Sequence, residues 1–127
     1  MIVTLIGSLQ FEDEWHEASK HLTLAGHIVI SVAVFPSTQG EKNWYTSAQK
    51  TTLDLVHLRK VAMADAVVLV HPDYIGQSTA REILYADQLG KQILRGAHGP
   101  RTWGHVVADI PKPKWDQLLV SEAAAKL

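Results

Sequence analysis

The chain has 127 residues, a formal net charge of −1 and a hydrophobic share of 46%. This size predicts one globular domain over residues 1–127, and the charge argues against a nucleic acid or a membrane surface as partner. The absence of cysteine excludes disulfides and thiol catalysis. The start lacks a signal-peptide pattern and no apolar run approaches membrane-spanning length, so we expect a cytoplasmic location.

Short β-branched runs alternate with segments of helical periodicity along most of the chain. The expected order is strand 2–6, helix 11–24, strand 27–34, helix 51–64, strand 66–70, a helix around Ala80–Leu89 and strand 92–94. Residues 35–50 show little periodicity and are expected to be mainly a long loop, a kind of segment that often serves function. Near the end, 105–110 is consistent with a short strand and 114–126 with a closing helix.

The repeated strand-then-helix order predicts the fold class. It implies an α/β, Rossmann-like three-layer sandwich, in which a small parallel sheet is flanked by helices on both faces. In open sheets of this kind, ligands bind beyond the carboxyl ends of the strands. The segment 74–83 is the most informative stretch, because it joins the buried strand 66–70 to the next helix and carries a glutamate.

Two interpretations of that segment stay open on local grounds. Thr79 and Glu82 fit a capping box at a helix start, with Gly76 supplying a permissive backbone angle. The alternative is a functional carboxylate at the crossover. A wider pattern bears on this choice: the segments 5–11, 25–27, 53–57, 64–67 and 74–82 occur in a familiar order.

Taken together, these segments resemble the nucleoside 2-deoxyribosyltransferase-like family, which includes nucleotide N-glycosidases. The resemblance covers roughly residues 2–95 and rests on the combination rather than on any one segment. It implies that Glu82 is the nucleophile of a double displacement: the base departs, and another base or water then takes the sugar. A carboxylate suits this chemistry, because the anomeric carbon becomes electron-poor as the base leaves.

The departing base also needs a proton or a hydrogen bond. Asp54 and His57 lie three residues apart on an expected helix and would share a flank. The resemblance implies an acid near the position of His57, so the acid or base role is assigned to Asp54 and His57 together. A partly buried structural histidine is the alternative for His57.

Several further residues are candidates for binding the substrate. Gly76 stands where related transferases carry a sugar-binding acid, and Asp73 is the nearest acid. Ser78 and Thr79, close to a helix start, would suit a phosphate through hydroxyls, backbone N–H groups and the helix dipole. Capping would explain the two hydroxyl residues equally well.

The first strand ends in Gly7 and Ser8, a loop that the resemblance places against the sugar or phosphate. Phe11 and Trp44, with Tyr45, are candidates for stacking on a nucleobase, because a flat π face accepts a planar base. The alternatives are a core role for Phe11 and ordinary loop anchoring for Trp44 and Tyr45.

Other chemistries find little support in the sequence. The seven histidines lack the paired spacing of a zinc site, so no metal is expected. The chain also lacks the glycine-rich dinucleotide fingerprint and the lysine-bearing phosphate loop, so no cofactor is expected. The sequence thus predicts an enzyme acting on a small-molecule nucleoside or nucleotide. A non-catalytic nucleotide-binding module is the alternative, and the resemblance implies a homodimer or larger homo-oligomer.

Overall fold

A computed structural model describes residues 1–33, 35, 45–71 and 74–95. The candidates Trp44 and Asp73 lie outside the described residues, as do the strand and helix expected over 105–110 and 114–126. No helix within the described ranges combines the length and the apolar character needed to cross a membrane.

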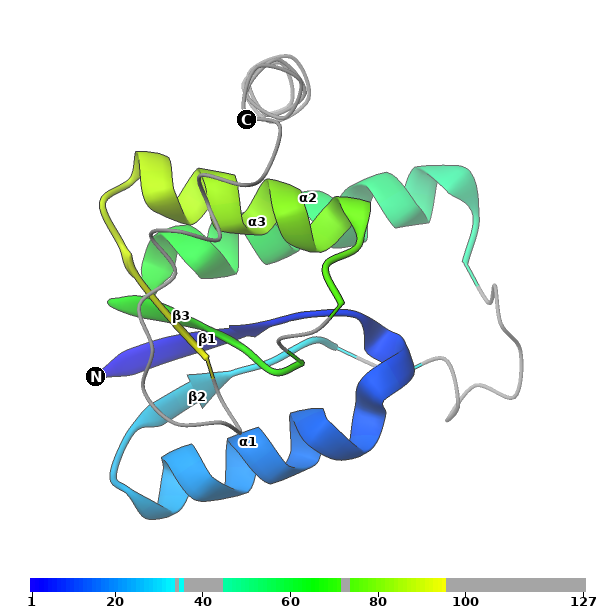
Figure 1. The fold of residues 1–127 in the computed structure, drawn as a ribbon. Helices are drawn as coiled ribbons and strands as arrows, with labels where there is room; N and C mark the ends of the chain where they lie inside the picture. The colour runs from blue at the N-terminus through cyan, green and yellow to red at the C-terminus, as the bar shows by residue number, and fades with distance from the viewer. Residues whose placement is uncertain (34, 36–44, 72–73, 96–127) are drawn as a thin grey trace.

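The described chain forms a parallel sheet between two helical layers, which confirms the predicted α/β sandwich (Figure 1). The sheet has four strands in the order β2-β1-β3-β4, and each strand runs parallel to its neighbours. The elements are β1 (Ile2–Ile6), the 3-10 turn η1 (Leu9–Phe11), α1 (Glu12–Leu24), β2 (Ile28–Ile30), α2 (Ser47–Met63), β3 (Ala66–Leu69), α3 (Gln77–Gln88) and β4 (Gln92–Arg95).

Alternation along the strands divides the core between the two faces of the sheet. Successive strand residues point to opposite faces, so every second side chain of β1 and β3 meets the same helical layer. One cluster lies against α1 and contains Val3, Leu5, Trp15, Ala18, Ala66, Val68 and Val70. We call this side of the sheet the α1 face.

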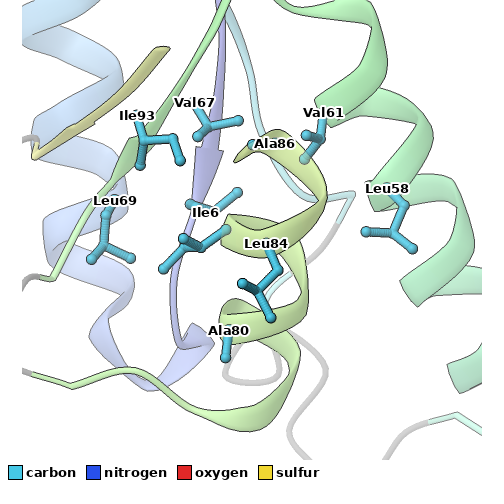
Figure 2. Packing of buried hydrophobic residues seen from close by; sticks show 10 residues of the cluster. Ile6, Leu58, Val61, Val67, Leu69, Ala80, Leu84, Ala86 and Ile93 are labelled. Carbon is cyan, nitrogen blue, oxygen red and sulfur yellow. The ribbon is translucent and has the colours of Figure 1, made fainter. Parts of the chain in front are cut away.

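The other face packs against α2 and α3, and we call it the α2·α3 face. Figure 2 shows side chains of its cluster, with Ile6, Val67, Leu69 and Ile93 coming from the strands. The helices contribute the remaining members, Leu58, Val61, Ala80, Ile83, Leu84 and Ala86. Full burial of one such aliphatic side chain contributes about 1.5–3 kcal/mol, so these two clusters fix both helical layers onto the sheet.

The largest differences from the predicted boundaries are at the end of β2 and the start of α2. β2 ends at Ile30 instead of continuing to residue 34, because its pairing with β1 stops at the Thr4–Ile30 pair and the next carbonyl, Ser31 O, accepts a hydrogen bond from Lys60 Nζ at 2.8 Å. α2 begins four residues early, at Ser47. A capping box between Thr46 and Gln49 starts this helix, and that Thr-x-x-Gln pattern was present in the sequence.

The capping-box interpretation of Thr79 and Glu82, one of the two that the sequence left open, is wrong. α3 begins at Gln77 with Gly76 as its N-cap, so Thr79 is inside the first turn and Glu82 lies in the second. Gly76 has φ −76° and ψ 176°, an extended backbone open to any residue, so it supplies no special angle either. Glu82 therefore cannot be explained as a helix-capping side chain.

Candidate active site

A cavity of about 470 Å³ opens beyond the carboxyl ends of β1 and β3. The strand order places β1 between β2 and β3, so the chain turns to one side after β1 and to the other after β2. Such a switch point is where open α/β sheets bind ligands, and the volume falls in the range of small-molecule sites. The loops after β1 and β3 line this cavity together with α2 and α3.

Glu82 lies in the cavity wall, on the side of α3 that faces the sheet and α2. Only 8% of the residue is exposed. Burial, followed by the nearby charge of Asp54, raises the pKa of the Glu82 carboxyl to about 8, while Lys50 acts in the opposite direction. The free protein therefore holds Glu82 largely protonated at neutral pH, and a nucleophilic carboxylate forms as the pH rises.

His57 comes from α2 and meets Glu82 across the two helices. Its Nε2 lies 3.1 Å from Glu82 Oε2 and 2.9 Å from the main-chain oxygen of Leu5. Burial lowers the pKa of His57 to about 4, although the Leu5 carbonyl acts to raise it. The two side chains are thus in close contact near pH 7 as neutral groups rather than as an ion pair.

Asp54 lines the same cavity one turn before His57 on α2. Lys50 Nζ donates to both carboxylate oxygens of Asp54, at 2.7 and 2.8 Å. This pair is partly open to solvent, so its net contribution to folding is small. Its position matters more, because it sets a positive and a negative charge beside the buried carboxyl of Glu82.

The loop after β1 forms another side of the cavity through Gly7 and Ser8. Gly7 has φ +149°, and a Cβ built there would lie 2.7 Å from Val70 Cγ2, so the position requires glycine. The Ser8 carbonyl accepts a hydrogen bond from Trp15 Nε1 at 3.0 Å. Trp15 thereby ties the loop to α1, and its ring also lines the cavity.

The loop before α3 and the first turn of α3 form a further side of the cavity, and Val32 and Ala33 after β2 also line it. Gly76, Ser78 and Thr79, the candidates of this segment for binding a substrate, all border the cavity. Thr79 is buried, whereas Ser78 is exposed. Tyr45 and Tyr74 also border the cavity, and either ring would suit a planar ligand.

Phe11 lies elsewhere. Its ring stacks on His71, with centroids 3.7 Å apart and planes 12° apart, and His71 Nδ1 lies 2.6 Å from Glu14 Oε2. This group ties the segment after β3 to the start of α1. Phe11 is not among the described residues that line the 470 Å³ cavity, so its predicted stacking on a nucleobase finds no support in the geometry.

The lining residues that were not anticipated include three cations and one buried aromatic residue: Lys50, Lys60, Arg81 and Trp15. Arg81 adjoins Glu82 in the chain, and Lys50 precedes Asp54 by one helical turn, so both could have been found by asking which charges neighbour the predicted catalytic residues. Trp15 carries no such signal, because its approach to the cavity depends on how α1 packs. Within the described ranges, His, Asp and Glu side chains form no group of three able to hold a metal.

Comparison of the chain with protein-family models, with curated proteins and with solved structures found no match.

Proposed function

We propose that this protein breaks or exchanges the N-glycosidic bond of a (deoxy)nucleoside or its 5′-monophosphate, with Glu82 as the nucleophile, as in the nucleoside 2-deoxyribosyltransferase-like family that its sequence resembles. The observation that carries the proposal is the carboxyl group of Glu82, buried in the wall of a 470 Å³ cavity at the switch point of the sheet. A buried carboxyl with a strongly raised pKa beside a cavity is typical of functional sites.

The reaction has two steps. In the first, the ionised carboxylate of Glu82 forms a C–O bond to the anomeric carbon as the C–N bond breaks. The base leaves with the electron pair of that bond and takes a proton from water or through the Lys50–Asp54 pair at the cavity. In the second, water or another base attacks the same carbon, the C–O bond to Glu82 breaks, and the attacking group loses a proton.

The charge of the cavity favours an anionic substrate. Its described lining includes the cations Lys50, Lys60 and Arg81 against the carboxyl groups of Asp54 and Glu82. The cations outnumber the carboxyl groups, and the difference grows near pH 7 because Glu82 is then largely protonated. This balance, with the hydroxyls of Ser78 and Thr79, supports a 5′-monophosphate over a free nucleoside.

The test is incubation of the purified protein with a panel of nucleosides and 5′-monophosphates, with and without a second free base, while base release is followed by chromatography. Glu82→Gln keeps the shape of the side chain and removes the nucleophile. We expect it to lower turnover by roughly 1,000-fold or more. Glu17→Gln, an exposed position on α1 outside the cavity, is the matched control and should leave the rate unchanged.

The competing function is a nucleotide-binding module that does no chemistry. It keeps the cavity and its hydroxyls, but it does not need Glu82 as a nucleophile. Absence of turnover for the whole panel, with nucleotide binding unchanged in Glu82→Gln, would favour the module. The resemblance also implies a homo-oligomer, and sedimentation of the intact protein measures that separately.

A further inference from the structure

The ring of His57 is held by groups from three separate elements. Its Nε2 contacts the Leu5 carbonyl of β1 at 2.9 Å and Glu82 Oε2 of α3 at 3.1 Å. The ring of Trp15, from α1, meets it edge-on with centroids 6.5 Å apart. His57 is 9% exposed, so the ring has little freedom to leave this arrangement.

The partners of Nε2 determine which nitrogen of His57 carries the proton. A main-chain carbonyl oxygen only accepts hydrogen bonds, so the 2.9 Å contact with Leu5 requires a hydrogen on Nε2. The same nitrogen lies 3.1 Å from Glu82 Oε2, while its hydrogen is directed at the Leu5 carbonyl. This nitrogen therefore donates in the resting protein and is not free to accept a proton.

We propose that His57 is a positioning residue for Glu82: a neutral imidazole, held at the end of β1 by its hydrogen bond to Leu5, whose Nε2–H also engages the adjacent Glu82 carboxyl when that group ionises. It engages Oε2 and leaves Oε1 as the oxygen that attacks. This role rests on the proposed function and replaces the acid or base role that the sequence suggested for His57. The proton of the leaving base then comes by another route.

The surroundings of His57 favour the neutral form. Burial is the main cause of its lowered pKa, and the positive charge of Lys60 acts in the same direction. The Leu5 carbonyl, whose effect is second only to that of burial, and the charge of Asp54 act to raise this pKa. An imidazole that remains neutral through the physiological range suits a fixed hydrogen-bond donor better than a group that must exchange protons.

Two variants separate positioning from acid–base catalysis. In His57→Gln the side-chain amide can still donate from near the place of Nε2, whereas His57→Leu removes the donor and keeps an apolar volume. Positioning predicts that His57→Leu lowers kcat about 100-fold with little change in KM, while His57→Gln recovers most of the rate. An acid–base role predicts instead that both variants lose activity equally and lose one limb of the pH–rate profile. That result would overturn the positioning proposal.

A measurement without substrate tests the same proposal. Nitrogen NMR of the wild-type protein should show the Nε2–H tautomer of His57, with no titration near the ordinary pKa of 6.5. Because a hydrogen bond to the charged carboxylate favours ionisation, His57→Leu should raise the Glu82 pKa further above its wild-type value of about 8, and His57→Gln should leave it near 8.

The Nδ1–H tautomer, or titration of His57 near 6.5, would overturn the proposal. The wild-type spectrum decides this even where His57→Leu fails to fold. Lack of turnover on every substrate would instead count against the proposed function, while the tautomer and the Glu82 titration would still decide whether His57 holds that carboxyl.

Discussion

The two faces of the sheet are built differently although they share the same strands. The α1 face is lined by apolar side chains. Among the residues of its cluster, only Trp15 has a polar side-chain atom, the indole Nε1. The α2·α3 face holds the buried polar side chains that the described residues contain, namely Thr4, His57, Thr79 and Glu82. Thr4 belongs there because its hydroxyl donates to the Lys60 carbonyl of α2 at 2.8 Å.

The difference between the two faces shows which part of the core contains groups that lower the stability of the fold. Burying a carboxyl group and an imidazole costs free energy that apolar side chains would not cost. The cost is confined to the carboxyl-end half of the α2·α3 face, while Ile6, Val67 and Leu69 continue the apolar core beside it. Breaks of local rules of this kind are expected at functional sites.

The largest expected effect on stability comes from neutralising Glu82. Its pKa is about 8 in the folded protein and 4.5 ordinarily, so the folded protein holds a proton that the unfolded chain releases between these values. The stability from this group is complete below about pH 4.5 and is lost as the pH rises through about 8. Glu82→Gln removes that loss, and we expect it to be more stable than the wild type by a few kcal/mol at about pH 9.

Denaturant unfolding of both proteins from about pH 5 to pH 9 measures this difference. Near pH 5 the two should agree within about 1 kcal/mol, because both side chains are then neutral. Glu17→Gln should follow the wild type at every pH. A constant gap between Glu82→Gln and the wild type across the range would contradict a buried, protonated Glu82.

Gly7→Ala tests the link between the α1 face and the cavity. A methyl group at Gly7 would meet Val70 Cγ2 at 2.7 Å, and the backbone angle of +149° is strained for alanine. We expect a loss of about 1–3 kcal/mol in the free energy of unfolding, with weaker substrate binding because the loop must shift. Thermal unfolding and KM check the two effects, and wild-type behaviour in both would show that the loop adjusts freely.

Trp15→Phe tests the hydrogen bond that the indole of Trp15 makes from the α1 face. Phenylalanine retains a ring in the core but cannot donate to the Ser8 carbonyl, which accepts from Nε1 at 3.0 Å. The expected cost is about 1 kcal/mol in stability, with a modest rise in KM, because Ser8 borders the cavity. Equal stability of variant and wild type in chemical unfolding would mean that this hydrogen bond is exchanged for water without cost.

Gly76→Ser should have the smallest effect. The backbone at Gly76 is extended, and an added Cβ would lie 3.5 Å from Tyr74 Cε1, an ordinary contact. Serine is a better N-cap than glycine, so we expect a gain of a few tenths of a kcal/mol in thermal unfolding. A loss as large as that of Gly7→Ala would show that α3 starts differently.

Much of the fold could be predicted from local patterns. The strands 2–6 and 66–70 were predicted from apolar, β-branched runs, which are typical of strands in a sheet buried on both faces. The observed β1 and β3 are the two central strands of the sheet. The edge strand β2 was predicted too long, since its end depends on pairing with β1. The start of α3 was missed because two overlapping sets of polar residues, around Gly76 and around Thr79, both fit a helix start.

For the candidate site, the sequence by itself determined which chemical groups are present and that Glu82, Ser78 and Thr79 follow a buried strand. Only the tertiary structure decided which of them meet. The contact between His57 and Glu82 joins two helices, and the Leu5 carbonyl that fixes the His57 tautomer is 52 residues away in the chain. The ring of Phe11 stacks on His71 and does not line the cavity. Local patterns govern backbone conformation, whereas burial, pKa and side-chain pairing depend on neighbours that come together only when the layers pack.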